Sequence, residues 1–494
     1  MPQKPHSTDY DPVTRSRASK AHEEDGEQRS GGSSPSPEAN EETPTPGQKS
    51  SFRPAARSNP NRKTTLKQGH AVSFIGLFLF TVIVYFRPYE LFSWLSWASS
   101  MAFVVAIFTL IVYAPTQLGL EGNLTTRPRE INLVLLLLAA SLLSIPLALN
   151  KLEAFYGFNE FLKVVLMFIV MVNVVRTEKR LRAMLLLVLI TSCIVSAAAV
   201  NDYRMGIFLR DLARNRIKGS GSNLFDNPND LALHLVTMVP IAFGLLLGSR
   251  GGLKKLFYAG CALLITIGVV ATFSRGGFIG LVGIAAVLAW RLAKSNKFLI
   301  VAGLPIALLL FLVFAPGGYT SRISSTTDDS GIARREELKR SLFVTLHHPL
   351  FGVGMNNYIL YSNVNHATHN AYTQVASELG VPAMVFYILF LITPLKGARR
   401  ISRETSATRR GSRHYYLAVG LEASLIGYMI SSFFLSVAYL WYIYFLVGYA
   451  ICFRRLYEAS LVEESGHAVS NGAAVKPAGH HAVPGLASSA SLSR

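Results

Sequence analysis

Three short polar segments, each beside an apolar stretch, carry the side chains best suited to chemistry in this sequence. The first, 214–230, places the cations Arg214, Arg216 and Lys218 before an Asn-Pro-Asn-Asp turn. The turn alone predicts a helix cap at Asn229 or Asp230, but a cap needs no cations. The cations indicate an anionic ligand, and contact with anionic lipid headgroups would explain them equally well.

The second segment is Phe273-Ser-Arg-Gly-Gly277, between two apolar stretches. The gap is so short that Arg275 must stay at the membrane edge, where an ionisable residue is costly and by default functional. Snorkelling of the guanidinium to lipid headgroups is the alternative. A tight turn at the paired glycines would present the guanidinium, which is suited to bidentate contact with phosphate oxygens.

The third segment, 366–380, places His369 directly before a predicted helix. An imidazole with an unperturbed pKa of about 6.5 could accept the proton of a sugar hydroxyl at neutral pH. The alternative is a capping or loop histidine. His347, His348 and His366 compete for the same role.

The sequence predicts no metal site and no cofactor. No pair of these histidines has helical ligand spacing with an accompanying acid. Asp328-Asp329 stands in SSTTDDSG, a context that indicates a solvated turn. The cysteines at 193, 261 and 452 lie inside apolar stretches and are expected to be packing residues.

The elements that position these segments are membrane helices. Of 494 residues, 50% are hydrophobic and only 16% are charged, against about a quarter in a typical soluble protein. The apolar residues form blocks of about 20 residues, the length that spans a bilayer. We therefore predict an all-α polytopic protein with about twelve spans: 71–86, 94–114, 131–149, 158–175, 181–200, 231–248, 253–273, 276–290, 298–315, 371–395, 416–433 and 438–453.

The distribution of Lys and Arg predicts the orientation. With the N-terminus in the cytoplasm, the inner connections are rich in these residues, most of all 396–415, and the short outer ones hold few. This asymmetry follows the positive-inside rule and puts both termini in the cytoplasm of a bacterial inner membrane. The net charge of +19 thus follows the loops, and no nucleic-acid partner is predicted.

The domain organisation follows from the same pattern. Polar, low-complexity composition predicts disordered cytoplasmic tails at 1–69 and 457–494 around a transmembrane domain at 70–456. A long periplasmic loop is predicted at 316–369. Within it, 333–346 has the pattern of an amphipathic helix lying on the membrane surface or over a cavity, its apolar face made of Leu338, Leu342, Phe343 and Leu346.

Taken together, the segments resemble the O-antigen ligase and O-antigen polymerase superfamily of bacterial membrane glycosyltransferases. The resemblance covers about 200–385, and its elements follow the family order. They are Arg216 with Gly221 and Phe225-Asp-Asn-Pro-Asn229, Ser274-Arg-Gly-Gly277, Pro349-Leu-Phe-Gly-Val-Gly354, and His369-Asn370 with Glu378-Leu-Gly380.

The resemblance implies a fold, a reaction and partners. The fold would be similar to the all-helical GT-C class. The donor would be a glycan on undecaprenyl diphosphate and the acceptor a hydroxyl of a glycan or of lipid A core, as in lipopolysaccharide or exopolysaccharide biosynthesis. Arg216 and Arg275 would engage the diphosphate, with Arg214 and Lys218 as neighbouring candidates, and His369 would activate the acceptor.

This chemistry agrees with the residues themselves. A glycosyl diphosphate develops negative charge as its C–O bond breaks, and two fixed arginines in a low-dielectric site can stabilise that charge. The alternative is a multi-span transporter or a flippase for lipid-linked glycans. A scaffold of a polysaccharide secretion complex is a third interpretation, but it would leave Arg275 and His369 without a role.

Overall fold

The computed structural model describes residues 66, 69–86, 100–207, 209–211, 214–216, 225, 227–292, 329–362, 367–406 and 413–472. The predicted tail 1–69 and the predicted span 298–315 lie almost wholly outside this part of the chain. The tail predicted from 457 begins inside a helix, which continues to Gly472, and residues 473–494 lie outside the described part. All of the elements below belong to one compact unit, 62–494.

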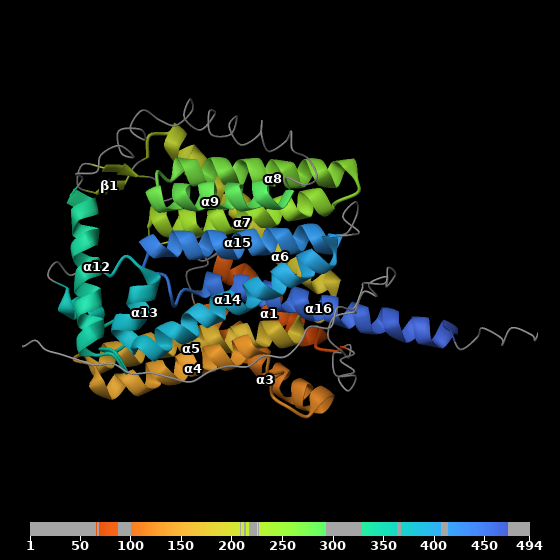
Figure 1. The fold of residues 1–494 in the computed structure, drawn as a ribbon, viewed down its shortest axis with the longest axis horizontal. Helices are drawn as coiled ribbons and strands as arrows, with labels where there is room; N and C mark the ends of the chain where they lie inside the picture. The colour runs from red at the N-terminus through yellow and green to blue at the C-terminus, as the bar shows by residue number, and fades with distance from the viewer. Residues whose placement is uncertain are drawn as a thin grey trace, which may run out of the picture. The chain divides into compact units, whose positions relative to one another are not determined.

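Helices dominate the described residues (Figure 1). The long helices that precede the predicted periplasmic loop are α1 (Ala71–Phe86), α3 (Met101–Glu121), α4 (Arg129–Ser144), α5 (Lys151–Val174), α6 (Glu178–Arg204), α7 (Pro228–Gly248), α8 (Gly252–Ala271) and α9 (Arg275–Leu292). The later helices are α12 (Asp329–His347), α13 (Ala371–Leu379), α14 (Val381–Glu404), α15 (Arg413–Ser431) and α16 (Trp441–Gly472). Short elements connect them: β1 (Leu209–Asp211), β2 (Arg214–Arg216), and the 3-10 turns η2 (Ile145–Leu147), η3 (Tyr358–Tyr361) and η5 (Ser432–Phe434).

The predicted membrane class is confirmed. Nine helices within the described ranges are long and apolar enough to cross a bilayer, and α1 is a shorter apolar helix. Most predicted spans coincide with one helix, although the span expected at 94–114 is α3, at 101–121. The span expected at 371–395 is wrong as a single helix, because Gly380, with φ 92°, separates α13 from α14.

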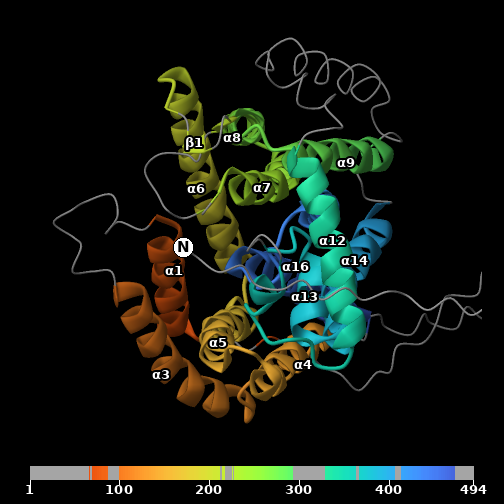
Figure 2. The ribbon, with the colours of Figure 1, turned by 90° about the vertical axis from the view of Figure 1, so that its left-hand side faces the viewer.

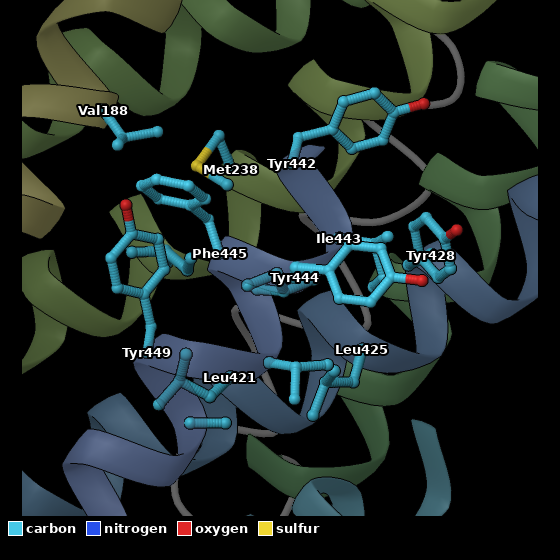
Figure 3. Close-up of a cluster of buried hydrophobic side chains, with 14 of the residues drawn as sticks. Val188, Met238, Leu421, Leu425, Tyr428, Tyr442, Ile443, Tyr444, Phe445 and Tyr449 are labelled. Atoms are coloured by element: carbon cyan, nitrogen blue, oxygen red, sulfur yellow. The ribbon is translucent and has the colours of Figure 1, made fainter. Parts of the chain in front are cut away.

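The first half of α16 forms the centre of the bundle. Its residues from Tyr442 to Phe453 are buried, as expected for a helix that is apolar on all sides. In Figure 3 its aromatic side chains lie among aliphatic side chains of α6, α7 and α15. The labelled members of this cluster are Val188, Met238, Leu421, Leu425, Tyr428, Tyr442, Ile443, Tyr444, Phe445 and Tyr449.

Glycines allow α7 and α15 to approach closely. A Cβ added at Gly244 would lie 2.7 Å from the Tyr416 carbonyl oxygen, and one at Gly420 would lie 2.6 Å from the Pro240 carbonyl oxygen. Such small-residue contacts are typical of helix pairs in membranes, where packing rather than hydrophobic expulsion drives association. A second contact shows that the two helices are antiparallel. Ser424, four residues after Gly420 on α15, donates to the carbonyl of Thr237, which lies three residues before Pro240 on α7.

The helix directions define two ends of the bundle. α7 and α9 begin at one end of the bundle, and α8 and α15 finish there. We call this end, around residues 227, 274 and 431, the site end. The opposite termini meet at what we call the basic end, around 248, 252 and 413. A helix of 21 residues such as α7 is about 30 Å long, the thickness of a bilayer's hydrocarbon core.

Candidate functional site

The first two polar segments meet at the site end through one hydrogen bond. The Ser274 hydroxyl donates to Asn229 Oδ1 over 2.9 Å and accepts the Gly277 N–H at 3.2 Å. Asn227 begins α7 by accepting the N–H groups of Asn229 and Asp230. The cap predicted at Asn229 or Asp230 is therefore at Asn227, and Pro228 takes the first helical position, which suits its fixed φ.

The turn before α9 differs from the one predicted. Its left-handed residue is Phe273, with φ 53°, while Gly276 and Gly277 lie within α9. These glycines serve close packing: a Cβ at Gly277 would lie 2.7 Å from the Ala232 Cβ, and one at Gly276 would lie 3.3 Å from the Phe434 Cβ. Arg275 is the first residue of α9 and is half-buried. Its cation thus stands at a helix N-terminus, where backbone N–H groups also favour an anion.

His369 occupies a constrained position before α13. Its φ is 53°, a left-handed conformation that is uncommon outside glycine. Its N–H donates to Ser436 Oγ over 2.8 Å. The next residue, Asn370, caps α13 by accepting the N–H groups of Tyr372 and Thr373. The backbone of His369 is therefore fixed on both sides, and the residue is half-buried.

The connection from α15 to α16, residues 431–436, joins the Arg275 turn to His369. Ser431 Oγ donates to the Gly276 carbonyl over 3.2 Å, and Phe434 contacts Gly276. Two residues later, Ser436 holds the His369 backbone. Sequence reasoning missed this connection. Its only signal was the break between the last two predicted spans.

The other two motifs of the resemblance pack against each other. The N–H groups of Val353 and Gly354 donate to the carbonyls of Ser377 and Glu378, each over 2.9 Å. We call residues 349–354 and 377–381 the loop clasp. A Cβ at Gly352 would lie 2.2 Å from the Glu378 carbonyl carbon, and one at Gly380 would lie 2.3 Å from the Leu350 oxygen. The clasp therefore requires glycine at both positions, which also have positive φ.

Glu378 places a buried carboxyl inside the loop clasp. Its side chain is only 4% exposed. Burial raises its pKa to about 8, an effect that the Tyr439 hydroxyl and the N–H groups of Asn356 and Tyr358 only partly offset. At neutral pH the carboxyl is mainly protonated, so it adds no charge to the interior of the clasp.

α12 contains the amphipathic helix predicted at 333–346 and lies across the site end (Figures 1 and 2). Its buried side carries Glu337, Ser341, Val344 and Thr345, and Glu337 accepts hydrogen bonds from Tyr358 at 2.6 Å and Ser362 at 2.8 Å. The predicted apolar face is largely outward: Leu342, Phe343 and Leu346 are 49%, 54% and 78% exposed. An outward apolar face is suited to contact with the membrane surface.

The competing histidines lie elsewhere. His347 and His348 are exposed at the end of α12, and His347 Nδ1 lies 2.9 Å from the Phe343 carbonyl oxygen. His366 and Asp328 lie outside the described residues. Among the residues that the structure describes, no three His, Cys, Asp or Glu side chains are grouped to hold a metal ion.

The arginines of the first segment lie in a small antiparallel hairpin that sequence reasoning treated as loop. β2 pairs with β1 so that Arg214 lies opposite Asp211 and Arg216 opposite Leu209. The hairpin follows α6, whose Tyr203 ring lies 6.0 Å from that of Phe273 in the Arg275 turn. Lys218 lies outside the described residues. Figure 1 shows β1 and α12 at the same end of the bundle.

Residues 260–388 match the O-antigen ligase family. The matched region contains the Arg275 turn, both halves of the loop clasp and His369, but not the hairpin with Arg214 and Arg216. No curated protein matches the chain.

Proposed function

We propose, from this match to the O-antigen ligase and polymerase superfamily, that the protein is a membrane glycosyltransferase. It transfers a glycan from undecaprenyl diphosphate to a hydroxyl of a glycan or lipid A-core acceptor. The observation that carries the proposal is the 431–436 connection, which holds the Arg275 turn through Gly276 and His369 through Ser436. The same short stretch of backbone thus contacts both the turn that carries the proposed diphosphate-binding cation and the residue proposed as the base.

The proposed step is a single displacement at the anomeric carbon. The acceptor oxygen forms the new bond to that carbon, and its proton passes to the His369 imidazole. The bond between the anomeric carbon and the diphosphate oxygen breaks with its electron pair, and undecaprenyl diphosphate leaves. Arg275 stabilises the negative charge that develops on the diphosphate, with Arg214, Arg216 and Lys218 as further cations. The anomeric configuration is inverted.

We assign the site end to the periplasm and both termini to the cytoplasm of a bacterial inner membrane. The support is the basic connection 396–415 at the opposite end, as the positive-inside rule requires. Single cysteines at Lys396 and Leu360 in a cysteine-free background test the orientation in intact cells. An impermeant maleimide should label position 360 and not 396, and labelling of both would overturn the assignment.

The reaction is tested with the purified full chain in proteoliposomes. Undecaprenyl-diphosphate-linked glycan and lipid A core, or a second glycan, are supplied, and the product is analysed by mass spectrometry. A new glycosidic bond, formed equally with and without EDTA, supports metal-independent transfer. Movement of the carrier lipid between leaflets without a new glycosidic bond would instead favour the flippase. Loss of the product with EDTA would bring the histidines and Asp328-Asp329 back as metal ligands.

A further inference from the structure

The basic end contains a cavity of about 1090 Å³ between α6, α7, α8, α15 and α16. Its inner wall is apolar, with Leu186, Ile190, Leu245 and Leu417 among the lining residues. Its rim holds four side chains that are cationic at neutral pH, from three different helices and the α7–α8 turn: Arg182, Arg250, Lys254 and Arg413.

The rim is strongly unbalanced in charge. Among the described residues that line the cavity, Glu178 is the only carboxylate, and it is already paired with Arg182 at 2.6 Å and with His414 at 3.2 Å. Within the described ranges, Arg250 and Lys254 have no acidic partner. Both are exposed at the cavity mouth. The rim therefore attracts an anion, whereas the wall excludes a ligand that is polar throughout.

We infer that the cavity binds an anionic phospholipid, with its phosphate at the Arg250–Lys254 rim and its acyl chains along the apolar wall. Basic pockets between transmembrane helices on the cytoplasmic side bind anionic headgroups in this way. The volume is at the upper end of small-molecule sites, which suits a headgroup with the first part of its chains. Beside the mouth, Leu253 and Leu256 of α8 are 83% and 71% exposed, so the chains can continue into the bilayer.

The site is separate from the proposed active site. α7 joins the two ends, and its length puts them about 30 Å apart. The proposed orientation of the protein decides only in which leaflet the phospholipid lies, namely the inner one. Binding itself depends on neither the orientation nor the transfer reaction, so its failure would leave both intact.

The experiment measures lipid preference in a symmetric bilayer. The purified full chain is reconstituted with spin-labelled phosphatidylglycerol or phosphatidylcholine, and the association ratio of the two is determined by electron paramagnetic resonance. We expect a clear preference of the wild type for phosphatidylglycerol. Arg250→Gln and Lys254→Gln should each reduce it about fivefold, since one basic residue near a membrane surface contributes about a factor of five. Ile190→Trp, which fills the apolar wall and leaves the rim intact, should reduce it as well.

The matched control is Lys396→Gln with Arg403→Gln. Both residues are exposed at the same end of the bundle but do not line the cavity. An equal loss in this control would show general surface electrostatics and overturn the site. An unchanged ratio in Ile190→Trp would show that only the rim binds, so that a free phosphate group suffices. Displacement of the spin label by undecaprenyl phosphate but not by excess phosphatidylglycerol would reassign the cavity to the carrier lipid.

Discussion

The two ends of the bundle use polar residues differently. From the middle of the bundle towards the basic end, arginines meet buried carboxylates: Arg291 and Arg399 contact Glu422 at 2.6 and 2.8 Å, and Arg454 contacts Glu130 at 2.7 Å. At the site end, the contacts described above are mostly those of neutral groups, such as Asn227, Ser274, Asn370 and Ser436, with backbone or with each other.

This difference separates two roles. These ion pairs connect helices that are far apart in sequence. Within each pair, one charge offsets the free-energy cost of burying the other. The neutral contacts of the site end fix turns and helix starts. We therefore expect substitutions at the basic end to affect stability and those at the site end to affect turnover.

The largest expected effect is on transfer in Arg275→Ala, which should abolish it while leaving the Tm unchanged. Arg275→Lys should recover little activity, because an ammonium cannot reproduce the forked contact with phosphate oxygens. Activity is measured as glycan product in proteoliposomes. Arg403→Ala, an exposed arginine of the basic end, is the control and should transfer normally. Full activity in Arg275→Lys or Arg275→Ala would mean that the guanidinium only snorkels to headgroups.

The next effect separates the candidate base from the other histidines. His369→Ala should lower kcat about 10²–10⁴-fold, the usual contribution of a general base. Binding of the lipid-linked donor, measured by co-purification, should persist because the arginines hold the diphosphate. His347→Ala should cost far less, since His347 is exposed at the end of α12. Normal turnover in His369→Ala would make His369 a loop residue.

Away from the site end, Glu422→Gln should destabilise the protein without a specific loss of chemistry. Its carboxylate is fully buried, and the substitution leaves Arg291 and Arg399 without their shared partner. Removing one partner of a buried ion pair typically costs about 3–5 kcal/mol. Thermal unfolding in detergent should show a lower Tm, and the protein that remains folded should retain its kcat. A normal Tm together with lost transfer would contradict the proposal that Glu422 serves stability and the site end serves turnover.

Local patterns in the sequence predict the helices but not these contacts. Apolar blocks of spanning length are sufficient to identify most of the helices, and the amphipathic pattern at 333–346 is sufficient for α12. The break at Gly380 does carry a local signal, because glycine often ends a helix and Pro382 suits the first turn of the next one. The apolar stretch that follows Gly380 outweighed this signal in the predicted span. Arg291 and Glu422 are 131 residues apart, and Ser436 and His369 are 67 apart. Contacts at such separations depend on the packing of the whole bundle.

The candidate site shows the same division. Arg275 and His369 can be proposed from residue type, position at the membrane edge and resemblance. The reason for the glycines cannot, because Gly276 and Gly277 accommodate Phe434 and Ala232 from distant helices rather than forming the turn. The loop clasp was likewise present in the sequence as two motifs, but their mutual packing appears only in the structure.

The smallest expected effect concerns the buried carboxyl of Glu378 in the loop clasp. Its pKa in the folded protein is about 8, whereas an unfolded glutamate has a pKa of about 4.3. Between these values the folded state keeps a proton that the unfolded state has lost, so this group lowers stability as pH rises from about 4.3 towards 8. Glu378→Gln retains a neutral group of similar shape and removes the titration. The Tm of Glu378→Gln minus that of the wild type should therefore increase from pH 5 to pH 8.

Glu336→Gln is the control, because Glu336 is 63% exposed and paired with Lys339, and its Tm difference should not grow in this way. A Glu378→Gln difference that stays constant with pH would mean that the carboxyl is ionised inside the loop clasp.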